Sequence, residues 1–135
     1  MSGITSLQTL LRNMTPEIRP GNYVFCTVKG EFSQYLSLSP IATFVEDEGL
    51  TLVLKKEDAQ QAGLAFSGEY KQITLMVHSS LEAVGLTAAV ASQLARSGIS
   101  ANVIAAFYHD HVFVQKEMAE AALKSLQELS LKEFN

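Results

Sequence analysis

The sequence predicts an α+β fold built from β-α-β-β-α-β units, and three observations lead to this prediction. In the second half, apolar runs and helical stripes follow one another as strand, helix, strand, strand, helix, which opens a split βαβ unit. The stretch "LVLKKEDA" at 52–59 resembles "VFVQKEMA" at 112–119, as expected of a degenerate repeat. A hydrophobic content of 47% over 135 residues supports a real core.

The first half is expected to begin with an amphipathic helix and to continue with strands. Ser6 is the expected N-cap, and the helix stops at Thr15 because the residue before Pro16 avoids helical backbone angles. Gly49 can take the positive φ that a short hairpin needs. In order, the expected elements are a helix over 7–14, a strand over 23–28, a loop over 29–40, strands over 41–45 and 50–54, and a helix over 56–62.

The second half has clearer periodicity. Leu86, Val90 and Leu94 form a helical stripe that Gly98 closes as a C-cap. The expected elements are a strand over 72–77, a helix over 86–97, strands over 99–107 and 112–115, and a helix over 117–129. The fourth strand of this unit is not evident, because the remaining "SLKEFN" is too polar to be a convincing strand.

The repeat suggests two domains, with an abbreviated half over 1–70 and a complete unit over 71–135. The abbreviated half lacks a clear helix between Val28 and Ile41. Convergence is the alternative to duplication, since many strand-to-helix junctions use residues of this kind.

Composition excludes several kinds of partner. Ten basic residues against fourteen acidic ones give a net charge of −4, and no basic run exceeds Lys55-Lys56, so neither nucleic acid nor an anionic membrane is expected to bind. No signal peptide, lipid-anchor motif or membrane-spanning run is recognisable. The single cysteine, Cys26, rules out an intramolecular disulfide and favours a cytoplasmic location.

The stretch "FYHDHVFV" at 107–114 invites three interpretations: a metal site, a catalytic cluster, or a polar hairpin tip that faces a ligand. His109 and His111 lie two residues apart on one face of a strand, and His78 is expected at the same edge, so a zinc site is one interpretation. Asp110 points to the opposite face and cannot easily orient either histidine, which argues against catalysis. We expect no metal and no catalytic residue, with either a solvated turn or a ligand-binding role for Asp110.

A split βαβ sheet brings three features to one edge: the end of its first strand, the start of its first helix near Val84, and the hairpin at Tyr108–His111. The helix start offers unpaired N–H groups and partial positive charge to a carboxylate, and Asp110 offers the opposite charge. This pairing is typical of a site for an α-amino acid.

The stretch "LTAAVASQLARSGISANVIAAFYHDHVFVQKE" at 86–117 resembles the ACT domain, a small ligand-binding regulatory module. It is similar to the regulatory domains of aspartate kinases and more closely to the animal cytosolic arginine sensors. The stretch "MTPEIRPGNYVFCTV" at 14–28 resembles bacterial proteins of unknown function that join a truncated ACT-like half to an ACT half.

The resemblance implies a ferredoxin-like βαββαβ sandwich, here as two degenerate halves side by side, and assembly into a homodimer or higher oligomer. In the family pattern, Gly85 and Leu86 match the residues that open the first helix, Phe107 matches an aromatic residue of the second strand, and Asp110 matches a ligand-contacting aspartate. The expected ligand-binding residues are Ser79, Ser80, Val84, Gly85, Leu86, Thr87, Ala106, Phe107 and Asp110.

Two departures leave the ligand open. The arginine sensors have an acidic residue and a threonine where this chain has Ala83 and Ala106, so an arginine side chain would lose polar partners here. The residues and the resemblance together predict a regulatory module that binds a small effector of the amino-acid class, without catalytic activity and without a cofactor. The rival prediction is a structural or protein-interaction pseudo-ACT module that has no effector.

Overall fold

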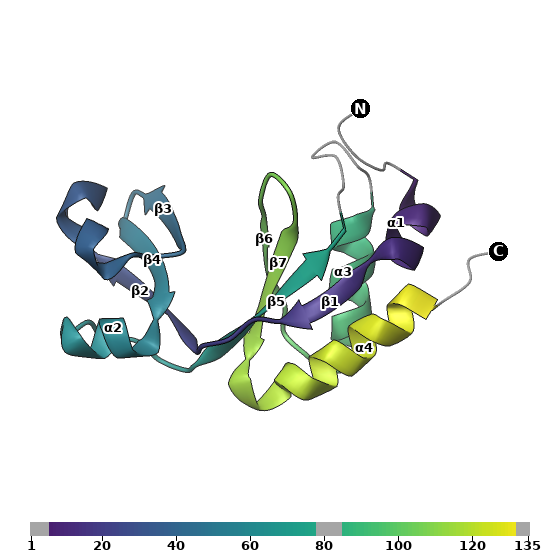
Figure 1. The fold of residues 1–135 in the computed structure, drawn as a ribbon. Helices are drawn as coiled ribbons and strands as arrows, with labels where there is room; N and C mark the ends of the chain where they lie inside the picture. The colour runs from purple at the N-terminus through teal and green to yellow at the C-terminus, as the bar shows by residue number, and fades with distance from the viewer. Residues whose placement is uncertain (1–5, 78–84, 132–135) are drawn as a thin grey trace. The chain divides into compact units, whose positions relative to one another are not determined.

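The computed structural model describes residues 6–77 and 85–131, which form two compact units. Unit 1 falls within Met1–Pro20 and Lys71–Asn135, and unit 2 is Gly21–Tyr70 (Figure 1). Unit 2 is thus inserted into the chain of unit 1. The expected division into 1–70 and 71–135 stays a proposal about sequence modules, since the compact units join the N-terminal segment to the second half.

Unit 1 is an antiparallel sheet with helices. Its elements are α1 (Leu7–Asn13), β1 (Thr15–Ile18), β5 (Tyr70–Met76), α3 (Leu86–Arg96), β6 (Asn102–Ala105), β7 (Asp110–Gln115), η2 (Lys116–Met118) and α4 (Ala119–Leu131). The strand order is β1-β5-β7-β6. With β5 as the first strand, this is the order 4-1-3-2 of a ferredoxin-like sheet, so the predicted fold class is confirmed.

The fourth strand of unit 1 is β1, which the sequence did not reveal. β1 pairs antiparallel with β5, from Thr15 opposite Met76 to Ile18 opposite Ile73. Pro16 is tolerated because β1 lies at the edge of the sheet, where a residue without an N–H group need not cost a hydrogen bond between strands. The strand that normally follows the second helix is therefore supplied by the N-terminal segment.

The core of unit 1 lies between one face of this sheet and the helices. Ile73, Leu75, Val112 and Val114 supply the sheet side of it. The helices contribute Leu10, Leu11, Leu86, Val90, Leu94, Ala122, Leu126 and Leu129. The Gln93 side chain also donates a hydrogen bond of 2.9 Å from Nε2 to the Ser125 carbonyl oxygen, which joins α3 to α4. The start of α3 is thus held on a packed scaffold.

Unit 2 is smaller. Its elements are β2 (Tyr23–Val28), η1 (Phe32–Leu38), β3 (Ala42–Glu46), β4 (Gly49–Lys55) and α2 (Lys56–Gln61), with the strands in the order β3-β4-β2. Tyr70 pairs with Tyr23 on the other side of β2. Its core contains Val24, Cys26, Leu50, Leu52, Leu54 and Ala59. The expected loop over 29–40 was wrong in part, because Phe32–Leu38 forms a 3₁₀ helix.

The hairpin of unit 1 also differs from the prediction. The expected strand over 99–107 was too long, since β6 ends at Ala105 and the Ala106 N–H donates to the His109 carbonyl oxygen at 3.0 Å. Phe107 and Tyr108 therefore occupy an exposed turn. Within the described residues, no helix is both long enough and apolar enough to cross a bilayer.

Candidate functional site

Asp110 is the first residue of β7 and lies opposite Ala105 of β6. The sequence placed it in the turn, but the structure puts it in the strand with only 9% of its surface exposed. Side chains two residues apart share a face, so Asp110 lies on the same face as Val112, which packs in the core beneath the helices. Its carboxylate is therefore directed to the helical side of the sheet.

The start of α3 meets this carboxylate. The Thr87 hydroxyl donates to Asp110 Oδ2 over a long 3.4 Å, which joins the first turn of α3 to the hairpin. Gly85 is the N-cap residue with a φ of 98°, and within residues 6–77 and 85–131 no side chain caps the helix. The first turn also contains no acidic residue, so its N–H groups and partial positive charge have no carboxylate from α3 itself.

Burial raises the pKa of the Asp110 carboxyl, while the Thr87 hydrogen bond and the nearby His111 act in the opposite direction. Desolvation is the largest of these causes. A carboxylate in this position lacks full solvation, and a cation placed beside it would favour its charged form. The local electrostatics therefore suit an ammonium or guanidinium group.

His109 and His111 both form hydrogen bonds to residues in or just after β5. His111 lies on the opposite face of the sheet, where its Nδ1 is 3.1 Å from both Gln72 Nε2 and Thr74 Oγ1. The Gln72 NH₂ group at Nε2 can only donate, so His111 Nδ1 accepts and the neutral ring carries its proton on Nε2. Burial, followed by the charge of His109, lowers the pKa of His111. His109 Nδ1 lies 3.1 Å from the Val77 carbonyl oxygen, to which it donates.

A metal site finds no support in residues 6–77 and 85–131, which contain no group of three or more His, Cys, Asp or Glu residues able to hold an ion. His78, the third histidine of the metal interpretation, lies outside these residues.

The other expected site residues fall into three groups. Leu86 is buried in the core, so only its backbone is available to a ligand. Ala106 and Phe107 are exposed, and the Phe107 ring packs edge-on against Tyr108 with centroids 5.0 Å apart. Ser79, Ser80 and Val84 lie outside the described residues. The structure thus brings Gly85, Thr87 and Asp110 together and leaves Phe107 at the turn.

Sequence reasoning missed a neighbour of this site, Leu7 of α1. A Cβ added to Gly85 would lie 3.2 Å from Leu7 Cδ2, so α1 packs beside the start of α3. The helical periodicity of 7–14 predicted α1 itself, but it contained no signal for where α1 lies. A side chain at position 85 would meet both this contact and a strained backbone.

Unit 2 has a corresponding arrangement at the end of β2, the start of η1 and the β3–β4 turn. A cavity of about 350 Å³ lies there, lined by Lys29, Gly30, Glu31, Phe32, Val45, Glu46, Asp47, Gly49 and Leu50. Its helix start is already satisfied, because the Glu31 carboxylate accepts the Gln34 N–H and the Gln34 side chain accepts the Glu31 N–H at 2.8 Å. The two helix starts therefore differ in what they leave open.

Two family models with the same description match the chain. A family model described as "ACT domain" matches residues 2–71, and a second model with the same description matches residues 67–128. Among curated proteins, none matches the chain.

Three solved structures are similar to this one. A Vibrio cholerae protein of unknown function, described as a possible transport protein, is 64% identical over 96% of this chain and 99% of its own, with a TM-score of 0.86. A protein from Agrobacterium tumefaciens is 18% identical, with coverages of 87% and 89% and a TM-score of 0.68. The regulatory subunit of aspartate kinase from Thermus flavus is 13% identical, with coverages of 85% and 96% and a TM-score of 0.65. The last two likenesses concern the fold alone.

Proposed function

The chain belongs to the ACT-domain family, and we propose that it is a regulatory module without catalytic activity that binds a free amino acid. ACT domains generally bind amino acids as regulatory modules, and this chain contains two of them in tandem. We further propose that it acts in the cytoplasm as a homodimer or higher oligomer. A small-ligand site would also suit the transport role suggested for the Vibrio cholerae relative.

One observation carries the proposal: the start of α3, which no described side chain caps, lies beside the buried carboxylate of Asp110. The N–H groups of the first turn would take the ligand's carboxylate, and Asp110 would take its ammonium or a cationic side chain. Charge-assisted hydrogen bonds of about 1.5 to 3 kcal/mol each are sufficient for micromolar to millimolar binding. Ser79, Ser80 and Val84 join this proposed site as part of "SSLEAVGLT", the segment expected to take the ligand's carboxylate through the N–H groups of the helix start.

A thermal-shift screen of the standard amino acids at millimolar concentration tests the proposal. A ligand that binds the folded chain raises Tm in proportion to the logarithm of its concentration once the site is nearly saturated. Asp110→Asn should sharply reduce the shift, while Asp47→Asn at the β3–β4 turn should preserve it. If no amino acid raises Tm, or if Asp110→Asn leaves the shift intact, the proposed site is wrong.

The alternative function is a protein-interaction module without an effector. It is favoured by the exposed aromatic pair, since Phe107 and Tyr108 are 68% and 64% exposed in the turn. Such a module would show no amino-acid shift, and replacing both aromatic residues by serine would release its protein partner. The amino-acid proposal predicts a shift in the wild-type chain whether or not a protein partner also binds.

A further inference from the structure

The proposed site at the start of α3 combines one partially positive helix end with one carboxylate. Among the described residues no side chain caps the first turn of α3, and Asp110 is the buried acidic residue beside it. The two charged ends of an amino acid match this pair, with the carboxylate at the helix start and the ammonium at Asp110. A charged side chain on the ligand would add a third charge, which needs a partner of its own.

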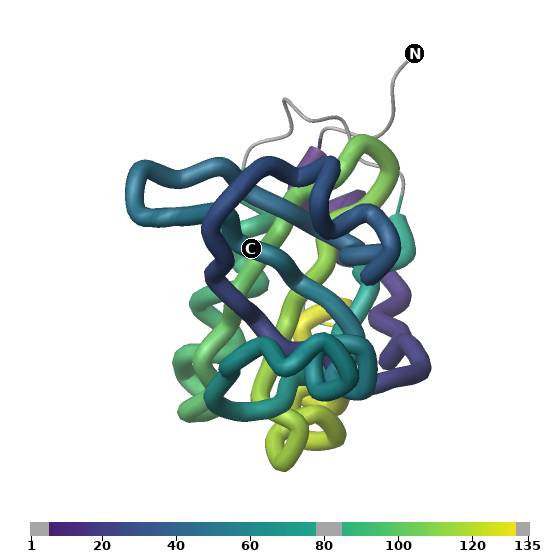
Figure 2. Tube along the Cα trace, turned by 90° about the vertical axis from the view of Figure 1, so that its left-hand side faces the viewer, coloured from purple at the N-terminus to yellow at the C-terminus, as the bar shows by residue number. Residues whose placement is uncertain are grey.

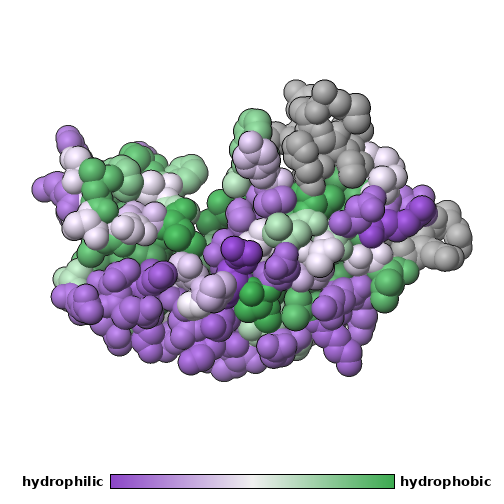
Figure 3. Space-filling model, in the orientation of Figure 1, coloured by the Kyte–Doolittle hydropathy of each residue, from purple (hydrophilic) through white to green (hydrophobic). Residues whose placement is uncertain are grey.

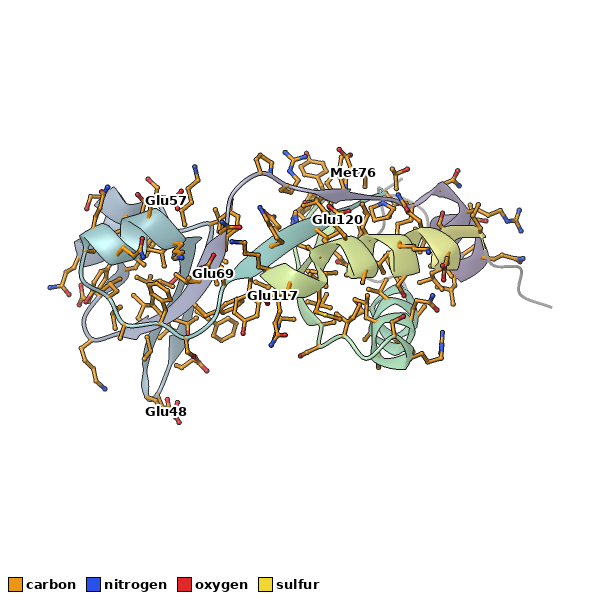
Figure 4. All side chains as sticks on the ribbon, turned by 90° about the horizontal axis from the view of Figure 1, so that it is seen from below. Glu48, Glu57, Glu69, Met76, Glu117 and Glu120 are labelled. Atoms are coloured by element: carbon orange, nitrogen blue, oxygen red, sulfur yellow. The ribbon has the colours of Figure 1, made fainter. Side chains whose placement is uncertain are left out.

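The other acidic residues described in unit 1 lie elsewhere. Glu117 and Glu120 follow the far end of β7, around the start of α4 (Figure 4). Figure 2 shows that start, in yellow-green, at the bottom of the view and the tip of the β6–β7 hairpin at the top. Glu17 faces the side of the sheet without helices, because it alternates with Ile18, which packs against the core. Glu128 is exposed on α4, on the side away from the core. A cationic side chain therefore finds no second carboxylate at the site among these residues.

An acidic side chain on the ligand meets the same difficulty. Arg96 lies in the last turn of α3, on the order of 15 Å along the helix axis from the first turn. Arg12 is exposed in the last turn of α1. The positive end of α3 is already taken by the ligand's own carboxylate. The charges of the site thus match an amino acid whose side chain is neutral.

The side chains that border the site are apolar. Leu7 of α1 lies against the N-cap residue, since a Cβ added to Gly85 would be 3.2 Å from Leu7 Cδ2. Leu7 is only partly buried, so part of its side chain is available for contact. Ala105 is exposed and lies directly opposite Asp110, on the same face of the sheet. In Figure 3 the tip of the β6–β7 hairpin is green and pale, the colours of hydrophobic and weakly polar residues.

We propose that this site is selective for amino acids with an uncharged aliphatic side chain, and that Leu7 is the residue that contacts this side chain. The inference rests on the proposed function, because it takes the carboxylate and ammonium contacts as given. The ferredoxin-like unit consists of β5, α3, β6, β7, α4 and β1. It does not need α1, so α1 is an added helix whose place beside the site gives it a role in recognition.

Isothermal titration calorimetry of the full chain with glycine, leucine, lysine and glutamate tests the selectivity. Glycine has the carboxylate and the ammonium but no side chain, so it measures the two charge contacts alone. Leucine should bind roughly 10-fold more tightly than glycine, because each methylene that fills an apolar pocket adds to discrimination. Lysine and glutamate should bind more weakly than leucine, since each has a charge without a partner.

Shortening Leu7 tests its contact with the ligand. Leu7→Ala should weaken leucine binding by about 5-fold or more through lost apolar contact, and it should change glycine binding by less than about 2-fold. Leu7→Asp should raise the affinity for lysine relative to leucine, because it supplies the missing carboxylate. Leu131→Ala and Leu131→Asp, at an exposed position of α4, are the matched controls and should bind like wild type. Thermal melts check that each variant is folded, and Leu7→Val decides the same question if Leu7→Ala is not.

The selectivity and the proposed function fail in different ways. If none of the standard amino acids binds, the proposed function is wrong and the selectivity falls with it. If lysine or glutamate binds more tightly than leucine, or leucine no more tightly than glycine, the selectivity alone is wrong. If shortening Leu7 weakens glycine and leucine equally, or weakens neither, Leu7 does not contact the ligand's side chain.

Discussion

The two units share a local arrangement of strand end, helix start and hairpin, but they fill the helix start differently. In unit 2, Glu31 and Gln34 form a capping box, so the chain's own carboxylate occupies the start of η1. In unit 1, no side chain among the residues that the structure describes caps α3, and its first turn has no acidic residue. Asp110 faces it from the hairpin, where its long bond to Thr87 only partly satisfies it. We therefore expect the start of α3, rather than that of η1, to accept the carboxylate of a ligand.

The two units also differ in their hydrophobic cores, and the core of unit 1 is the larger. Leu94 is fully buried where α3 packs on this core. We expect Leu94→Ala to lower the free energy of unfolding by about 2 to 5 kcal/mol through lost burial and a residual cavity. Urea denaturation measures this change. Leu131→Ala, at an exposed position of α4, should stay within about 0.5 kcal/mol of wild type; equal effects of the two would contradict the packing described.

The next largest effect concerns the ligand. Asp110→Asn should weaken amino-acid binding by about 1.5 to 3 kcal/mol, roughly 10- to 100-fold, because the amide cannot pair with an ammonium charge. Isothermal titration calorimetry with the amino acid found in the thermal screen measures the loss. Glu31→Gln in unit 2 is the matched control and should leave the affinity unchanged. The reverse result would assign the site to unit 2.

The capping difference can be removed by design. Ala88→Glu places a carboxylate in the first turn of α3, near the helix start that Glu31 caps in η1, and Ala88 is exposed. The helix should gain about 0.3 to 1 kcal/mol from its dipole, while the ligand's carboxylate loses affinity to repulsion. Thermal melts with and without ligand measure both changes. Ser92→Glu, further along the same helix, should change neither; a rise in affinity for Ala88→Glu would exclude the anion site.

The smallest expected effect is a pH dependence from His111. Its folded pKa lies below the usual 6.5, so the unfolded chain binds the proton more readily. The stability that comes from the neutral ring is fully present above pH 6.5 and is lost as the pH falls through 6.5 toward the folded pKa. His111→Gln should flatten the dependence between about pH 7 and pH 5 by less than about 1 kcal/mol, since solvent screens the half-buried ring. An unchanged slope in chemical denaturation would contradict this.

Much of the fold followed from local patterns, and the exceptions have physical reasons. β1 was missed because, in the local sequence, Pro16 indicates only the end of the preceding helix. A proline is tolerated in β1 because this strand lies at the edge of the sheet, and that position is set by pairing with β5, far along the chain. η1 was predicted as a loop because its apolar residues Phe32, Tyr35 and Leu38 recur every three residues, the period of a 3₁₀ helix, and so do not form the stripe of an α-helix. Glu31 and Gln34, spaced as in a capping box, were the signal that could have found it.

The site was predictable in part. The position of Asp110 near the start of α3 followed from the split βαβ topology, and the Thr87 hydrogen bond agrees with it. The position of Phe107 did not, because an aromatic residue favours a strand locally while the Ala106-to-His109 hydrogen bond places Phe107 in the turn. No pattern within α1 could show that Leu7 packs against Gly85, since that contact depends on tertiary structure.

The most direct test of the central claim is amide NMR of the full chain during titration with the amino acid found by the thermal screen. The account predicts saturable shift changes at the amides of Leu86, Thr87 and Ala88 and at Asp110. It predicts no matching changes at Phe32, Ser33 and Gln34, because the start of η1 is already capped. Changes centred on η1, with the first turn of α3 unaffected, would contradict it.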